Sequence, residues 1–252
     1  MLVPRNPLWR LTPYQNATRW LVLAKHCAPL NASVYSGNTA IGSVVWQSAA
    51  SDLELVRVAP VTNQRYVWCQ AHHSGTGICN PFLQYSPLAN NQVFMLSGGR
   101  ERRLAVTGWS NAPDEAFCTS GWSTGVRCVW LGMTLGPGNL RPNYDHISAA
   151  HSYEANSLDA GDSGGAVLTY DRNLIGIISG RNSGDASILH YTPMAQVLQE
   201  LYSYNLAPTN VAAAVGEDNP LPPDDENAGW ELAPADDDDG NDGTGQTQHI
   251  GG

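Results

Sequence analysis

The sequence contains the five-residue stretch Gly161-Asp162-Ser163-Gly164-Gly165. Average residue usage predicts this string by chance on the order of a few times in ten thousand chains of this length. Glycines on both sides of a serine allow a sharp turn and leave the amides of Gly161 and Ser163 free to point at one spot. Two converging amides are the donors that a developing oxyanion requires. The stretch therefore predicts a nucleophilic Ser163 beside an oxyanion hole formed by the Gly161 and Ser163 amides.

A histidine and an acid in suitable positions precede this serine. A serine hydroxyl becomes a good nucleophile when a base takes its proton and a carboxylate orients that base. His26 follows the apolar stretch 20–24, which predicts a buried strand, and Asp52 opens an alternating, strand-like stretch. Glu54 has the same parity as Asp52 and is the alternative acid. The chain order His26, Asp52, Ser163 excludes the subtilisin and α/β-hydrolase orders.

These motifs resemble those of the chymotrypsin/trypsin-like serine proteases, and in particular the bacterial streptogrisin and alpha-lytic branch. Residues 118–128, Cys-Thr-Ser-Gly-Trp-Ser-Thr-Gly-Val-Arg-Cys, are similar to a segment of that branch. The resemblance covers roughly residues 18–205. It implies an all-β chain of two antiparallel six-stranded β-barrels with the active-site cleft between them. It also implies that Thr192–Leu206 is a helix that closes the second barrel.

The same resemblance implies a pocket for the substrate side chain. Its floor is expected at Ser157, six residues before the nucleophile, and its wall at Ser179, Gly180 and Arg181. A serine floor lacks the carboxylate that holds Lys or Arg, so a trypsin-type preference is not expected. Arg181 either points into the pocket and selects an acidic side chain, or points to solvent and leaves a chymotrypsin-like preference.

The chain departs from the family pattern near its start. Only 25 residues precede His26, where the family needs about one more strand, and the usual cysteine partner of Cys27 is absent. We therefore expect an incomplete N-terminal barrel and a sequence that lacks its true N-terminus. The stretch after Met1 also lacks the pattern of a secretory signal.

Two further departures concern the second half. Thr119 stands where the bacterial branch has an arginine that pairs with the aspartate before the nucleophile. Asp162 is therefore expected to pair with Arg103 or Arg127 instead. The 110 residues between Asp52 and Ser163 imply inserted loops, which we expect at 69–80 and 133–158.

Four cysteines form two pairs with nine residues between the members, Cys69 with Cys79 and Cys118 with Cys128. This spacing fits a disulfide across a hairpin, which indicates an oxidising compartment. For the first pair, a zinc site with His72 and His73 is the alternative. Because adjacent histidines rarely bind one metal well, we expect the disulfide and no metal site.

Composition agrees with many short strands and excludes several classes of protein. The chain has 252 residues, of which 25 are glycine, 16 are proline and only 14% are charged. No apolar run approaches the length of a membrane-spanning helix. The net charge is −10, but eleven acidic residues lie in 217–252, so the rest is nearly neutral and offers no basic stripe for nucleic acid.

The sequence therefore predicts three parts and one leading function. The parts are an N-terminal barrel over 1–86, a C-terminal barrel with its helix over 87–207, and a disordered acidic tail over 208–252. The leading function is a secreted, monomeric serine endopeptidase that acts on proteins or peptides without a cofactor, away from membranes and nucleic acids. The alternatives are an intracellular or viral polyprotein-processing protease and an inactive binding module on the same fold.

Overall fold

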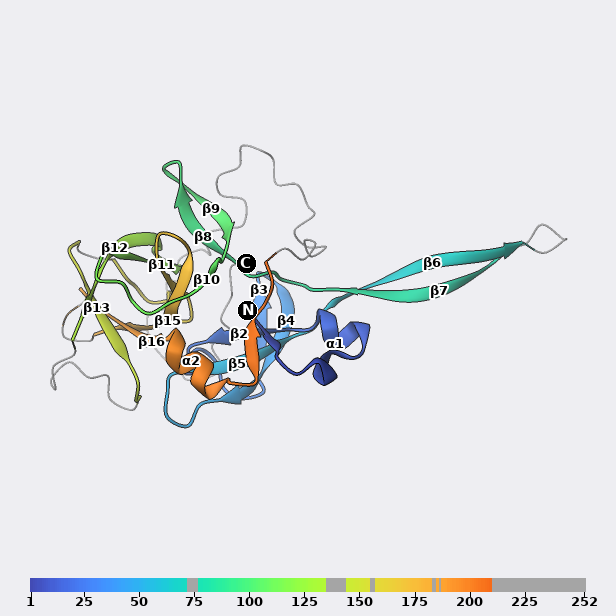
Figure 1. Ribbon diagram of the computed structural model, residues 1–252, viewed down its shortest axis with the longest axis horizontal. Helices are drawn as coiled ribbons and strands as arrows, with labels where there is room; N and C mark the ends of the chain where they lie inside the picture. The colour runs from blue at the N-terminus through green and yellow to red at the C-terminus, as the bar shows by residue number, and fades with distance from the viewer. Residues whose placement is uncertain (72–76, 135–143, 155–156, 183–184, 186, 210–252) are drawn as a thin grey trace.

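The computed structural model (Figure 1) consists of two β-sheets side by side and two β-hairpins that project from them. It describes residues 1–71, 77–134, 144–154, 157–182, 185 and 187–209, with the backbone alone for 64–71 and 77–82. The predicted disordered tail thus lies outside the described residues from position 210 onward. Within the described ranges, no helix is long and apolar enough to cross a bilayer.

The first sheet carries the predicted histidine and aspartate. Its order is β17 (Tyr204–Leu206), β1 (Leu2–Pro4), β2 (Arg19–Leu23), β5 (Glu54–Val58), β4 (Thr39–Gln47) and β3 (Ser33–Ser36), and all neighbours are antiparallel. Strands β2 and β5 confirm the expectation from the apolar stretch 20–24 and the alternating stretch that Asp52 opens. No pairing among the described residues joins β3 to β17, so this sheet stays open.

The second sheet is closed and carries the predicted nucleophile. Its order is β10 (Gly108–Trp109), β15 (Asn173–Arg181), β14 (Ala166–Leu168), β11 (Phe117–Gly121), β12 (Gly125–Met133), β13 (Ser148–Ser152) and β16 (Ile188–Pro193). Strand β16 also pairs with β15, which closes six strands into a barrel. The all-β class and this six-stranded barrel are confirmed.

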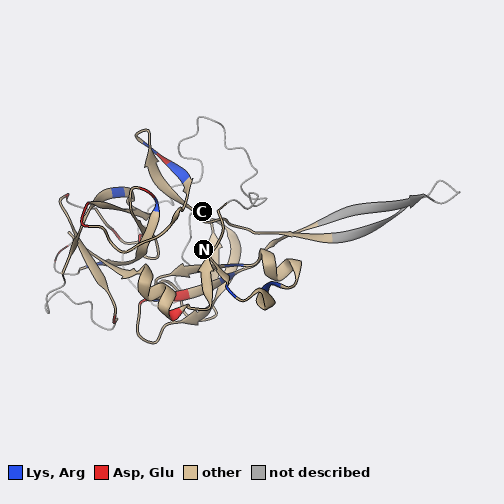
Figure 2. Ribbon diagram, viewed as in Figure 1, with Lys and Arg blue, Asp and Glu red and all other residues tan. Residues whose placement is uncertain are grey.

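Two hairpins connect the sheets. Strands β6 (Val61–Ala71) and β7 (Gly77–Ser86) form a long arm that points away from both sheets (Figure 1). Within the expected loop at 69–80, the described residues 69–71 and 77–80 belong to these paired strands rather than to an irregular insertion. The second hairpin pairs β8 (Gln92–Ser97) with β9 (Arg100–Ala105) and lies beside the closed barrel. Figure 2 shows few charged residues, the arginines of β9 among them.

The helices are short, and the predicted helix over Thr192–Leu206 is wrong in its extent. Helix α2 spans Met194–Glu200 only. Thr192 and Pro193 belong to β16, where they pair with β15, and Tyr204–Leu206 returns as β17 to pair with β1. Backbone pairing with partners far along the chain overrides the helical stripe at both ends. The other helical segments are η1 (Pro7–Arg10), α1 (Pro13–Ala17) and η2 (Lys25–Cys27).

Buried apolar side chains join the two sheets and fill the closed barrel. One cluster includes Leu2 and Val22 of the first sheet, Leu168 of the second and Val197 of α2. A second cluster fills the closed barrel around Trp130. Because the first cluster contains residues of both sheets, it holds together the loops that carry the predicted catalytic residues.

Candidate active site

His26 and Asp52 are in direct contact. His26 lies on η2, directly after β2, and its side chain is 30% exposed, whereas Asp52 is fully buried just before β5. The distance from His26 Nδ1 is 2.8 Å to Asp52 Oδ2 and 3.1 Å to Oδ1. The backbone N–H of His26 also donates to Oδ1 at 3.2 Å. Because a carboxylate only accepts, Nδ1 is the donor in this contact, and in the neutral imidazole Nε2 is then the acceptor.

The hydroxyl of Ser179 also donates to Asp52, at Oδ2. The sequence placed Ser179 in the wall of the substrate pocket. In the structure, its side chain is fully buried and its hydroxyl faces the aspartate. Hydrogen bonds to a carboxylate favour its charged form. Ser179 is therefore a second side-chain partner of the carboxylate that contacts His26.

The loop before Asp52 is tied to the turn of His26. Ser48 Oγ accepts from the amides of Ala50 and Ser51 at 3.1 and 2.8 Å, which closes a tight turn. Lys25 Nζ donates to the Ser48 carbonyl at 2.7 Å. The contact between Lys25 and Ser48 joins the turn of His26 to the loop that precedes Asp52. No sequence motif marked this contact, because the two residues are 23 positions apart in the chain.

The loop of Ser163 packs against the same turn. Gly164 has a φ of +83°, and a Cβ at this position would lie 3.2 Å from Leu23 Cδ2 and 3.5 Å from Cys27 Sγ. The Cys27 thiol lies 3.6 Å from the Ser163 carbonyl oxygen, within reach for a weak S–H donor. Only a glycine allows both this backbone conformation and this approach. The fold thereby brings the backbone of Ser163 next to the residue that follows His26.

The predicted oxyanion donors are available. Gly161 has a φ of +96°, in the left-handed region that favours glycine. The amides of the two residues after Ser163 make hydrogen bonds within the protein: Gly164 N–H donates to Ile178 O at 2.8 Å and Gly165 N–H to Asp162 O at 3.0 Å. In the part of the chain that the structure describes, the amides of Gly161 and Ser163 donate to no protein acceptor.

The expected partners of Asp162, Arg103 or Arg127, are wrong. The buried carboxylate instead accepts hydrogen bonds from the turn between β11 and β12 and from its own loop. The donors are Ser123 N at 2.7 Å, Thr124 N at 3.0 Å, Thr124 Oγ1 at 2.9 Å and Asp159 N at 2.8 Å. Four donors satisfy a buried carboxylate without a cation.

Thr119, which stands in place of the arginine, has a role of its own. Its Oγ1 accepts the indole N–H of the buried Trp130 at 2.9 Å. Gly121 makes room for Asp162, since a Cβ there would overlap Oδ1. The segment 118–128 thus still serves the nucleophile loop, but through its turn rather than through an arginine.

The expected pocket residues are placed as follows. Ser157 is buried, and its hydroxyl lies 2.7 Å from Ser152 Oγ and donates to the Glu154 carbonyl at 3.0 Å. Gly180, next to Ser179, has a φ of +138°. Arg181 is half exposed, and its Nη1 lies 3.7 Å from Asp159 Oδ1. The guanidinium therefore leans toward the segment that precedes the nucleophile.

The cysteine predictions have separate outcomes. The Cys118–Cys128 disulfide is confirmed, with a Cα–Cα distance of 3.8 Å, shorter than the expected range of about 4.4–6.8 Å. Cys69 and Cys79 are directly opposite in the β6–β7 ladder. Their side chains, and the histidines of the alternative zinc site, lie outside the described residues. Elsewhere, the described chain holds no cluster of three or more metal-ligating side chains.

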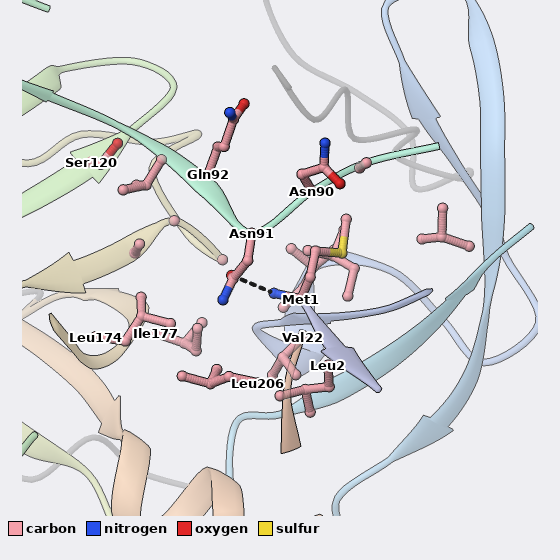
Figure 3. A pocket seen from close by; sticks show the side chains of 18 of the residues that line it. Met1, Leu2, Val22, Asn90, Asn91, Gln92, Ser120, Leu174, Ile177 and Leu206 are labelled. Atoms are coloured by element: carbon pink, nitrogen blue, oxygen red, sulfur yellow. Dashed lines mark hydrogen bonds between the residues drawn. The ribbon is translucent and has the colours of Figure 1, made fainter. Parts of the chain in front are cut away.

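A cavity of about 500 Å³ lies between the two sheets, behind the nucleophile loop (Figure 3). Its wall is largely apolar, as at Val22, Leu174 and Ile177. Gly164 and Gly165 form part of the lining, but neither His26 nor Ser163 does. None of the predicted triad residues His26, Asp52 and Ser163 therefore lines this cavity.

Comparison with known proteins gives structural likeness only. No protein-family model and no curated protein matches the chain. Among solved structures, Cellulomonas bogoriensis chymotrypsin is similar with 22% identity, a TM-score of 0.48 and coverage of 75% of this chain and 85% of that one. Thermobifida fusca protease A has 19% identity, a TM-score of 0.49 and coverage of 77% and 87%. Nocardiopsis protease has 20% identity and a TM-score of 0.49, with coverage of 77% of this chain and 88% of that one.

Proposed function

We propose that the chain is a serine endopeptidase. The observation that carries the proposal is the contact between His26 Nδ1 and the buried Asp52, with the loop of Ser163 packed on the turn of His26. A buried, hydrogen-bonded anion that fixes one imidazole nitrogen leaves the other free to act as a base. Such an arrangement has a clear chemical use when a serine lies next to it.

The proposed reaction has two halves. In the first, Ser163 Oγ attacks the carbonyl carbon of a peptide bond, and its proton passes to His26 Nε2. Asp52 stabilises the imidazolium that forms, and the amides of Gly161 and Ser163 hold the oxyanion. His26 then gives the proton to the leaving amine as the C–N bond breaks. In the second half, His26 takes a proton from a water molecule, whose oxygen attacks the carbonyl carbon of the acyl ester. The proton then returns to Ser163 Oγ as the ester C–O bond breaks, and the acid product leaves.

The substrates we propose are proteins or peptides without a basic side chain at the scissile bond. The Ser157 hydroxyl is occupied by Ser152 and the Glu154 carbonyl, and it carries no charge that would hold Lys or Arg. The guanidinium of Arg181 is the nearest basic group predicted at the pocket. The neighbouring Asp159 would compete with an acidic substrate side chain for this guanidinium. Profiling a peptide library with the parent and Arg181→Gly separates an acidic preference from an apolar one.

We also propose that the protein works as a monomer in an oxidising, extracellular setting. The Cys118–Cys128 bridge supports this setting, because such bonds persist where thiols are not kept reduced. A viral or intracellular processing protease remains the alternative setting for the same chemistry. Retention of the bridge in protein isolated from its native compartment distinguishes the two.

A fluorophosphonate probe tests the proposed chemistry. Only a serine with an active base is expected to form the phosphonyl adduct, so the parent should be labelled and Ser163→Ala should not. Ser163→Ala should also abolish peptide hydrolysis while leaving the thermal unfolding curve unchanged. A folded parent that neither takes up the probe nor cleaves peptides would be an inactive binding module.

A further inference from the structure

A second acidic side chain, Glu54, is buried close to Asp52 and has no part in the proposed chemistry. It is the first residue of β5, opposite Leu23 of β2 and Gln47 of β4. Glu54 is 0% exposed. Its Oε2 accepts from Gln47 Nε2 at 3.2 Å, and Oε1 has no hydrogen-bond partner among the described residues. A buried carboxyl group in such surroundings favours its protonated form.

The surroundings of the two acids differ in a way that separates their charges. Asp52 accepts from the His26 backbone, the imidazole and the Ser179 hydroxyl. Burial, by contrast, raises the pKa of Glu54 to about 7; hydrogen bonds from the Gln47 amide and the Ala28 backbone oppose this rise, and the charge of Asp52 adds to it. Two neighbouring carboxyl groups ionise together only at a cost. The single negative charge of the pair is therefore expected on Asp52.

Gln47 connects Glu54 to the turn that carries His26. Besides contacting Glu54, its Nε2 lies 2.7 Å from the carbonyl oxygen of Ala28 and 3.3 Å from that of Lys25. These two carbonyls stand on either side of His26 in the chain. The side-chain amide thus bridges the buried acid and both ends of the short turn.

We propose that Glu54 is a positioning residue: together with Gln47 it holds the turn of His26 from the buried side, and as a neutral acid it leaves the negative charge of the site to Asp52. This inference rests on the proposed function, because it assigns Glu54 a role in orienting the base. Glu54 touches no reacting atom, so its effect reaches the chemistry only through His26 and Asp52.

The role predicts a second titration in the activity profile. The elements around Glu54 carry these charged or titratable groups: Asp52, all three residues of η2 (Lys25, His26 and the buried thiol Cys27), and the exposed Arg57 on β5. Strand β4 contributes none, and Arg19 stands at the other end of β2. When Glu54 loses its proton near neutral pH, a second negative charge comes next to Asp52. That charge disfavours the arrangement in which Asp52 alone carries the charge beside His26, so the kcat/KM of the parent is expected to fall as pH rises through about 7.

The test compares pH profiles of kcat/KM for the parent and Glu54→Gln, which keeps the shape but cannot ionise. We expect the kcat/KM of the parent to fall as Glu54 ionises above about pH 7, and that of E54Q to keep its plateau. The ratio of the kcat/KM of E54Q to that of the parent should therefore rise about threefold between pH 6 and pH 8. Glu115→Gln changes an exposed acid and serves as the matched control, with the profile of the parent. Identical profiles for E54Q and the parent would overturn the proposal.

A second variant keeps the test valid if E54Q folds poorly. Gln47→Met retains much of the side-chain volume but lacks the amide, so it should lower kcat about tenfold with little change in KM, as expected when a base is misoriented. An unchanged kcat in folded Q47M also counts against the proposal. Fluorophosphonate labelling of the parent distinguishes failure of the Glu54 role from failure of the proposed function. If the parent is labelled and the E54Q profile matches it, only the role of Glu54 is refuted. If the parent is neither labelled nor active, the proposed function itself is refuted.

Discussion

The hydrogen bonds on Asp162 lead to a measurable prediction about the nucleophile loop. Thr124→Val keeps the size of the side chain but removes the hydroxyl that donates to Oδ2 at 2.9 Å. A hydrogen bond to a charged, buried group contributes about 1.5–3 kcal/mol. For a folded domain of this size, each kcal/mol shifts Tm by roughly 2–4 °C. A loss of about 2 kcal/mol therefore predicts a Tm roughly 4–8 °C below that of the parent.

Thermal unfolding followed by circular dichroism measures this shift, and peptide hydrolysis measures its consequence. Because Asp162 immediately precedes Ser163, a looser carboxylate should also lower kcat. Thr124→Ser retains the hydroxyl and should stay within about 1 °C of the parent. Arg127→Ala removes an arginine that the sequence suggested as the partner, and it should leave Tm unchanged. If T124V melts together with T124S, or if R127A is as destabilising as T124V, the assignment of these hydrogen bonds is refuted.

Three further predictions concern the acids and the disulfide. Asp52→Asn should lower kcat by about 10³–10⁴-fold, because an amide no longer fixes the tautomer of His26 or stabilises its charge; steady-state kinetics with a folded variant checks this, and a loss under tenfold would contradict it. Replacing both Cys118 and Cys128 by Ala should cost about 3 kcal/mol in urea unfolding, the chain-entropy value for so short a loop, with the reduced parent as control. Burial raises the pKa of Glu54 from 4.5 to about 7, so the folded state binds this proton more tightly than the unfolded state does. The resulting contribution to the free energy of unfolding is complete below about pH 4.5 and is lost as pH rises through about 7. Unfolding free energies should therefore show Glu54→Gln gaining up to about 3 kcal/mol on the parent between pH 5 and 8, and a pH-independent difference would exclude the shifted pKa.

The sequence alone determined the class of fold and the candidate catalytic residues. The apolar stretch 20–24 and the alternating stretch that Asp52 opens identified β2 and β5, because strand periodicity is a local property of the chain. The glycines around Ser163 identified the nucleophile loop for a similar reason, since a sharp turn needs them at fixed positions. The Cys118–Cys128 spacing likewise depends only on a local hairpin.

The tertiary structure decided which groups meet across long stretches of chain. It assigned His26 to Asp52 rather than to Glu54, although both acids have the same strand parity. It gave Asp162 donors from a turn 38 and 39 residues away instead of an arginine. It also ended α2 early, because the residues after it pair with β1 at the opposite end of the sequence. Each of these outcomes depends on burial and on hydrogen-bond partners that only the packed sheets bring within reach, and such partners leave no periodic signal in the sequence.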